Sequence, residues 1–301
     1  RNFDCDLALD GIRQMLWGFF KKVVVADNCA LFVNGVFENY QTLDGSTLFL
    51  GAFFFTIQIY GDFSGYSDIA IGCARLFGID LMQNFKYPYF SRDIAEFWRR
   101  WHISLTTWFR DYIYIPLGGS RAGKWKSFRN TLVIFLVSGF WHGANWTFVA
   151  WGAYHALLFL PLLLLGQNRR YRDSVAENSF LPSVKELTQM GATFLLVLLG
   201  WILFRSEDIS QAAVYLERMF NVSLFSAPQL VGLGFGQLLL KKCFFFTALM
   251  FVVEWIGRKQ AHGLMIEDLS LPVRYVIYTV LLIIIYGFDA SNPQGFIYFQ
   301  F

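Results

Sequence analysis

One stretch decides the fold: Ser138-Gly139-Phe140-Trp141-His142-Gly143-Ala144-Asn145-Trp146-Thr147, which lies inside the longest charge-free run of the sequence. Asp, Glu, Lys and Arg are all absent from residues 130–168. Because about 20 apolar residues span the hydrocarbon core of a bilayer, a run of this length predicts membrane helices. Polar groups at membrane depth are costly and tend to mark function. His142 is therefore the first candidate for a functional residue.

The composition also favours a membrane protein. Of the 301 residues, 55% are hydrophobic and only 16% are charged, whereas about 25% are charged in soluble domains. Further apolar spans are expected at 45–61, 187–204, 238–257 and 272–288. We therefore predict an all-α, polytopic integral-membrane protein with interfacial or re-entrant helices, forming a single domain over residues 1–301.

The deciding stretch is expected to bend between two crossings. Gly139 and Gly143 allow close backbone approach there. If the segment were helical, Asn145 and Trp146 would share a face with His142, three and four residues further on. Apolar surroundings disfavour the charged imidazole, which leaves the ring available as a general base. The alternative is a buried histidine that only hydrogen-bonds a neighbouring helix, and the residues alone leave both open.

A basic segment precedes this run. Residues 92–129 hold eight Lys or Arg against three Asp or Glu, a net charge of +5. The positive-inside rule makes this segment cytoplasmic, and its charge would also attract an anionic donor or lipid headgroups. One interfacial helix, capped by Ser91, is expected to carry Phe97–Leu105. His102 on it is either a second functional histidine or a residue at headgroup level.

Two further features leave alternatives. Asp62 and Asp68 fall in a polar segment that interrupts an apolar helix, so they either pair internally or line a cavity. Lys21 and Lys22 lie in an apolar helix, which suggests a membrane-surface position with the ammonium groups in water; a tilted membrane crossing is the alternative. His155 would lie opposite His142 on a continuous helix, so we expect it to be structural.

The motifs resemble those of the membrane-bound O-acyltransferase (MBOAT) family, most closely its bacterial alginate O-acetyltransferase branch. The combination FWRRWHISL, IPLGGSR and SGFWHGANWTF carries the resemblance. The matching segments are Gly18–Val23, Gln58–Gly72, Asn84–Phe90, Phe97–Leu105, Asp111–Gly119, Ser138–Gly152 and the closing run 292–301. They cover almost the whole chain but only the C-terminal two-thirds or so of a typical member, so we expect membrane helices before Arg1.

The resemblance implies helices around a tunnel through the bacterial inner membrane. It places the family's essential histidine at His142 and its second invariant histidine at His102. The donor it implies is acetyl-CoA or another acyl thioester from the cytoplasm, with no bound cofactor. The acceptor is an extracytoplasmic polysaccharide, and a separate extracytoplasmic acetyltransferase protein makes the final transfer.

Other residues are assigned supporting roles. The candidates for lining or supporting the tunnel are Asn145, Trp141, Trp146, Asp62, Asp68 and Asp111. The basic residues expected on the donor side are Arg99, Arg100 and Arg110. We expect no metal, because HxxxH and HExxH motifs are absent. Membrane lipid is an expected partner and nucleic acid is not.

Three other functions compete with this one. A transferase of the same fold could move D-alanine from a carrier protein onto teichoic acid. A transporter or channel for a small polar solute would also use Asp62, Asp68 and His142 at membrane depth. A catalytically silent scaffold is disfavoured because both histidines of the family are present.

Overall fold

The computed structural model describes residues 4–121, 123–230, 236–288 and 295–296. These residues form helices, turns and loops without a strand, so the all-α prediction is confirmed. The chain divides into two compact units: unit 1 comprises residues 1–83 and 218–301, and unit 2 comprises residues 84–217. The prediction of one domain over the whole chain stays a prediction. The predicted match of 292–301 lies outside the described residues except for 295 and 296.

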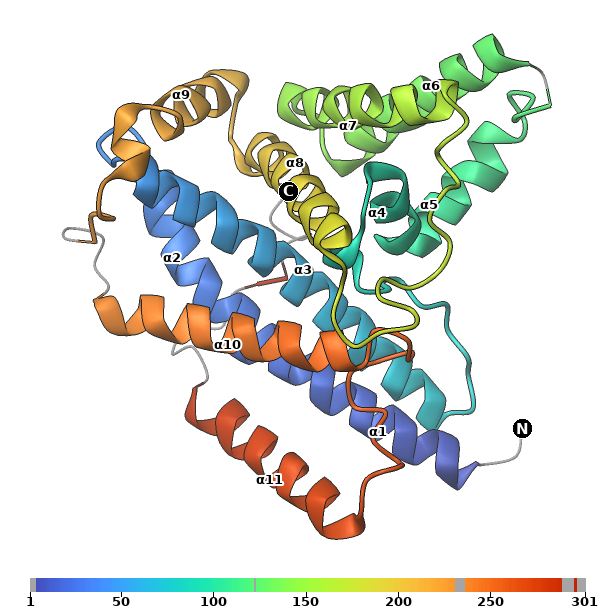
Figure 1. The fold of residues 1–301 in the computed structure, drawn as a ribbon, viewed down its shortest axis with the longest axis vertical. Coiled ribbons are helices and arrows are strands. Elements are labelled where there is room, and N and C mark those ends of the chain that lie inside the picture. The colour runs from blue at the N-terminus through green and yellow to red at the C-terminus, as the bar shows by residue number, and fades with distance from the viewer. Residues whose placement is uncertain (1–3, 122, 231–235, 289–294, 297–301) are drawn as a thin grey trace. The chain divides into compact units, whose positions relative to one another are not determined.

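Unit 1 is built on a helical hairpin (Figure 1). Its first arm consists of α1 (Cys5–Phe19), the π-helix η1 (Phe20–Ala26) and α2 (Asp27–Glu38), and its second arm is α3 (Gly45–Leu76). α3 packs against all three segments of the first arm. A Cβ atom on Gly18 would lie 2.6 Å from the carbonyl oxygen of Gly65. One on Gly65 would lie 2.8 Å from that of Gly18, so the lack of a side chain at both positions permits the close packing of the two helices.

The remaining helices of unit 1 come from the end of the chain. They are η4 (Val222–Phe225), α10 (Gln237–Ile256) and α11 (Leu271–Gly287). α10 contacts α2 and η1, and α11 contacts η1 and α1. The bounds of α10 and α11 agree closely with the apolar spans predicted at 238–257 and 272–288.

The π-helix η1 carries two lysines into the hairpin. Lys21 Nζ lies 2.7 Å from Asp68 Oδ2, and Lys22 Nζ lies 2.6 Å from Asp62 Oδ1. The Lys21 side chain is only 4% exposed, so the predicted position with its ammonium group in water is wrong. The reason is that carboxylates on α3 pair with both lysines, as buried charges require. Among the two readings of Asp62 and Asp68, the structure favours internal pairing.

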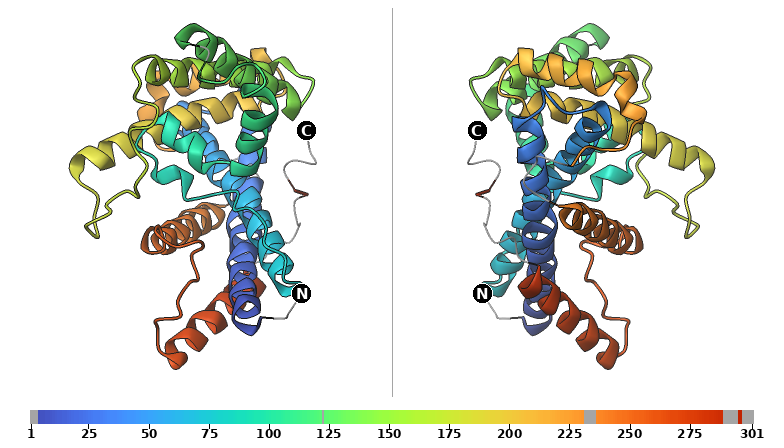
Figure 2. Two further views of the ribbon diagram at one scale, coloured as in Figure 1. Left: turned by 90° about the vertical axis from the view of Figure 1, so that its right-hand side faces the viewer. Right: turned by 90° about the vertical axis from the view of Figure 1, so that its left-hand side faces the viewer.

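Unit 2 is a group of short and long helices. Its elements are η2 (Pro88–Phe90), α4 (Ile94–Arg100), α5 (Ile103–Phe109), the π-helix η3 (Arg110–Tyr114), α6 (Lys124–His142), α7 (Trp146–Leu164) and α8 (Val184–Arg205). α9 (Ile209–Met219) crosses the boundary between the units. α6 and α7 form a closely packed pair, visible in both views of Figure 2, and α7 also packs against α4 and α8.

Glycines bring α6 and α7 together. A Cβ atom on Gly139 would collide with the carbonyl oxygen of Phe148, and one on Gly152 would collide with that of Phe135. Each glycine therefore allows one backbone to touch the other. The two contacts fix an antiparallel pairing, which sets the position of the last residue of α6 against α7.

The prediction of one continuous helix through residues 97–105 is wrong. α4 ends at Arg100 and α5 begins at Ile103, and His102 between them has a left-handed backbone with φ of 43°. Asp93 rather than Ser91 is the N-cap of α4, because its side chain accepts a hydrogen bond from the Glu96 N–H. The break gives the segment two short helices in place of one.

Two of the described helices are long and apolar enough to cross a membrane, namely α7 and α8. α11 is apolar but shorter. The larger number of crossings expected of a polytopic protein stays a prediction.

Candidate functional site

The deciding stretch forms the corner between α6 and α7. α6 ends at His142 and α7 begins at Trp146, so the predicted bend is confirmed. Asn145 is the N-cap of α7, because its side chain accepts a hydrogen bond from the Thr147 N–H at 3.0 Å. Its amide also donates to the carbonyl oxygen of Glu207 at 2.6 Å. The helix break means that Asn145 and Trp146 do not share a helical face with His142.

Aromatic rings from three helices surround the imidazole of His142. The ring centroid of Trp141 lies 5.0 Å away, that of Trp151 on α7 lies 5.3 Å away, and that of Phe204 on α8 lies 5.1 Å away. His142 with these three rings is called the aromatic cluster. Apolar walls of this kind disfavour imidazolium and favour the neutral ring that can accept a proton.

His102 reaches the same cluster from the break between α4 and α5. Its ring centroid lies 6.4 Å from that of Trp141, which in turn contacts His142. The two imidazoles are close enough to interact electrostatically. The structure thus brings together the two histidines that the resemblance singled out, both within unit 2. Their catalytic roles stay predictions.

Burial acts on the protonation of His102. It lowers the pKa of this histidine from 6.5 to about 4. The cause is desolvation, which penalises the charged imidazolium. His102 is therefore neutral at physiological pH and can accept a hydrogen bond or a proton at one ring nitrogen.

Asn84 holds the break at His102, a role that the sequence analysis did not predict. Its carbonyl oxygen accepts a hydrogen bond from the Ile103 N–H at 3.0 Å, and its side-chain Oδ1 accepts one from the Ser104 N–H at 3.2 Å. These bonds satisfy N–H groups at the start of α5. The only indication in the sequence was the position of Asn84 in a connector, which does not reveal its partner.

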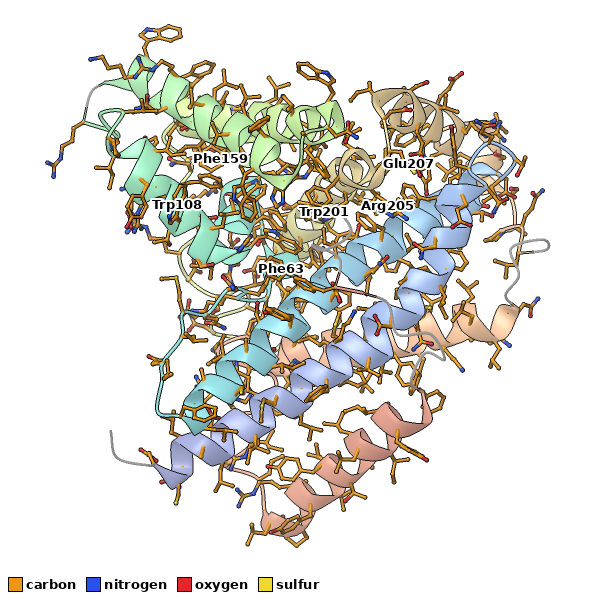
Figure 3. All side chains as sticks on the ribbon, turned by 180° about the vertical axis from the view of Figure 1, so that it is seen from behind. Phe63, Trp108, Phe159, Trp201, Arg205 and Glu207 are labelled. Atoms are coloured by element: carbon orange, nitrogen blue, oxygen red, sulfur yellow. The ribbon has the colours of Figure 1, made fainter. Side chains whose placement is uncertain are left out.

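His155 is fully buried beside the aromatic cluster. Its ring centroid lies 5.0 Å from that of Trp98 and 5.2 Å from that of Trp151. Trp151 therefore contacts both His142 and His155. Trp201, on α8 in Figure 3, stacks on Trp151 at 5.8 Å. This close aromatic packing agrees with the structural role expected of His155.

The other predicted site residues lie outside the cluster. Asp62 and Asp68 belong to unit 1, where they pair with lysines. Asp111 forms an exposed ion pair with Arg110 at 2.7 Å, in the π-helix η3. Trp146 is 77% exposed. Within this supporting set, it is Trp141 whose ring lies next to both histidines.

The three arginines predicted on the donor side, Arg99, Arg100 and Arg110, do not lie at one site. Arg99 and Arg100 line a cavity of about 390 Å³, here called the basic cavity. Arg110 is not among its lining residues, which are Lys86, Glu96, Arg99, Arg100, Arg169, Tyr171, Arg172 and Ser174. Across the described ranges, no group of three or more His, Cys, Asp or Glu side chains is placed to hold a metal ion.

Comparison with known proteins relates the chain to one family. Residues 12–180 match the family described as MBOAT, membrane-bound O-acyltransferase. The match runs from α1 in unit 1 to the loop before α8 in unit 2. It includes both histidines of the candidate site.

Three relatives show how far the likeness extends. A probable alginate O-acetylase of Pseudomonas aeruginosa is 40% identical over 245 residues, which are 80% of this chain and 45% of that protein. A peptidoglycan O-acetyltransferase of Helicobacter pylori is 38% identical over 68% of this chain and 38% of its own length. A teichoic acid D-alanyltransferase of Bacillus subtilis is 29% identical over 67% of this chain and 52% of its own length. The chain thus spans about half the length of the curated relatives it matches.

Proposed function

Because this chain belongs to the membrane-bound O-acyltransferase family, we propose that the whole protein is an O-acyltransferase of the membrane that acts on an extracytoplasmic polysaccharide. The observation that carries the proposal is the meeting of His102 and His142 at the ring of Trp141. An imidazole held neutral in an apolar shell is suited to accept a proton from a hydroxyl group.

The reaction proposed is transfer of an acetyl group from a thioester to a hydroxyl. His142 takes the proton of the hydroxyl as its oxygen attacks the acetyl carbonyl. The C–O bond forms and the C–S bond breaks, and the proton passes from His142 to the departing thiolate. A transient acetyl-His142 is an alternative route to the same products. Hydrogen-bond donors near Asn145 would stabilise the oxyanion in either route.

The direction of transfer follows from the charge of the chain. The basic segment 92–129 faces the cytoplasm by the positive-inside rule. We propose that an acetyl thioester such as acetyl-CoA enters from that side and that a tunnel leads the acetyl group outward. A separate extracytoplasmic acetyltransferase protein would complete the transfer to the polymer. We propose that the protein is a multi-pass component of the bacterial inner membrane.

Alginate or a similar exopolysaccharide is the acceptor we favour. Support comes from the identity with the probable alginate O-acetylase of Pseudomonas aeruginosa, which exceeds that with the Bacillus subtilis D-alanyltransferase. Transfer of D-alanine to teichoic acid is the second candidate, since that relative aligns with 67% of this chain at 29% identity.

The experiment uses membranes that contain the full-length protein and its neighbouring gene products. They are incubated with labelled acetyl-CoA in one arm and with a labelled D-alanyl carrier protein in the other. We expect label to appear on polysaccharide or on an extracytoplasmic protein only in the acetyl arm. Label from the D-alanyl arm alone would establish the second candidate, and uptake of an intact solute without group transfer would indicate a transporter.

A further inference from the structure

The basic cavity of unit 2 has a wall that hydrogen bonds hold in place. Its wall is the loop 168–174, and three arginines of the α4 region donate hydrogen bonds to carbonyl oxygens of this loop. Arg99 donates to Asn168 and Tyr171, and both Arg92 and Arg100 donate to Asp173. The loop is therefore fixed against α4, and the cavity between them has a defined shape.

The acidic residue of the cavity is already neutralised. Glu96 Oε1 accepts hydrogen bonds from Arg100 at 2.7 Å and from Arg92 at 3.0 Å. Its second oxygen accepts from the backbone N–H and Nε of Arg92. Two guanidinium groups thus share one carboxylate, so the side chains of Glu96, Arg92 and Arg100 together carry a net charge of +1.

Four cations of the cavity lack a carboxylate partner. Within the parts of the chain that the structure describes, no ion pair to Asp or Glu is formed by the side chains of Lys86, Arg99, Arg169 and Arg172. Burial lowers the pKa of Arg99, the charges of Asp93 and Glu96 oppose this shift, and the nearby charges of Arg100 and Arg172 add to it. An anion in the cavity would relieve this repulsion.

The size and chemistry of the cavity point to phosphate. About 390 Å³ lies within the range of ~300–1,000 Å³ typical of small-molecule sites. Guanidinium groups bind phosphate oxygens in bidentate geometry, and a phosphate monoester offers three acceptor oxygens and up to two charges. We propose that the basic cavity binds the phosphate groups of a small phosphorylated molecule, with Arg99, Arg169, Arg172 and Lys86 as its ligands.

Two sources carry this chemistry. One is a soluble phosphorylated thiol such as coenzyme A, or its thioester, and the other is the headgroup of an anionic lipid. Arg169 and Arg172 are the residues to change, because both are exposed and, within the described part of the chain, their side chains donate no hydrogen bond that holds the fold. The charge-reversal variant is Arg169→Glu/Arg172→Glu, and Arg169→Lys/Arg172→Lys keeps the charge but loses the fork geometry.

The test measures binding by the full-length protein, without requiring acyl transfer. Coenzyme A is titrated against the protein in neutral detergent, and bound phosphatidylglycerol is counted by native mass spectrometry from lipid nanodiscs. The matched control is Lys185→Glu/Lys241→Glu, which reverses two exposed charges outside the cavity. Size-exclusion profiles check that each variant is folded.

We expect Arg169→Glu/Arg172→Glu to weaken binding of one probe about tenfold or more, since each charge-assisted contact is strong. The affinity of Arg169→Lys/Arg172→Lys should fall between that of the charge-reversal variant and that of wild type. The affinity of the control should equal that of wild type. Added salt should weaken wild-type binding. Loss of coenzyme A affinity identifies the soluble source, and loss of bound lipid identifies the headgroup. If both probes bind the charge-reversal variant as they bind wild type, or if the control loses as much, the phosphate site is refuted.

Discussion

At the scale of single residues, His102 is the most constrained member of the candidate site. Its left-handed backbone costs an L-residue roughly 1–2 kcal/mol. Such conformations persist only where the surroundings over-determine them, and they gather at functional sites. Here Asn84 supplies the restraint by bonding to the first residues of α5. At this break the imidazole lies 6.4 Å, between ring centroids, from Trp141.

His102→Gly and His102→Ala separate the backbone from the side chain. Glycine adopts positive φ freely and alanine does not, so the glycine variant should be more stable than the alanine variant by about 1 kcal/mol. Thermal unfolding in detergent measures the difference. Acetyl transfer should fall in both variants, because neither has an imidazole. Equal stability of the two would mean that the left-handed conformation is not strained.

The depressed pKa of His102 predicts a pH dependence of stability. Between about 6.5 and about 4 the imidazole is protonated in the unfolded chain but not in the folded one. Protons therefore favour unfolding, and the contribution of His102 to stability is lost as pH falls through this window. The stability of wild type relative to His102→Gln should decrease from pH 7 to pH 4. A difference that stays constant over this range would contradict a desolvated, neutral imidazole in the folded protein.

At the scale of helices, the pairing of α6 with α7 positions His142. Gly152→Ala would place a methyl group against the carbonyl oxygen of Phe135, so the two helices must separate. We expect a loss of about 1–3 kcal/mol in stability, as for other overpacked contacts, and a lower rate of acetyl transfer.

The matched control for this prediction is Gly191→Ala on α8. A Cβ atom there meets nothing within 4 Å, and alanine favours a helix over glycine by about 1 kcal/mol. This variant should be as stable as wild type or more stable. If Gly152→Ala behaved like Gly191→Ala in thermal unfolding, the close approach of α6 and α7 would not be what holds His142 in place.

Helices could be predicted from the sequence where an apolar span is bounded by charged or polar residues. Glu186 and Arg205 bracket the span that became α8, and the ends of α10 and α11 are close to those expected. The break at His102 could not be predicted, because FWRRWHISL contains neither Gly nor Pro and the restraint comes from Asn84. The π-helix η1 was missed for a similar reason, so Lys21 was placed in water rather than beside Asp68.

The candidate site was predicted in part. The resemblance named His102 and His142, but nothing in the residues alone indicated that Trp141 would link them. The basic cavity was anticipated only through Arg99 and Arg100. Its other arginines, Arg169 and Arg172, lie in a loop far along the chain, and only the fold of unit 2 brings them to α4.

At the scale of the whole molecule, the orientation in the membrane can be tested. The segment 92–129 is expected to face the cytoplasm. Lys124→Cys, in a protein whose Cys5 and Cys73 are replaced by serine because both are exposed, provides a site for a membrane-impermeant thiol reagent. Labelling should occur only after the cells are permeabilised. Labelling in intact cells would place the segment outside and reverse the proposed direction of transfer.

The central claim is that the imidazole of His142 carries acyl transfer, and one measurement tests it most directly. Labelled acetyl-CoA is supplied to membranes containing the full-length wild type, His142→Ala or His142→Gln, with equal amounts of inserted protein confirmed by size-exclusion in detergent. Loss of a general base predicts a fall of about 10²–10⁴-fold in both variants. Transfer at the wild-type rate by either correctly inserted variant would contradict the account.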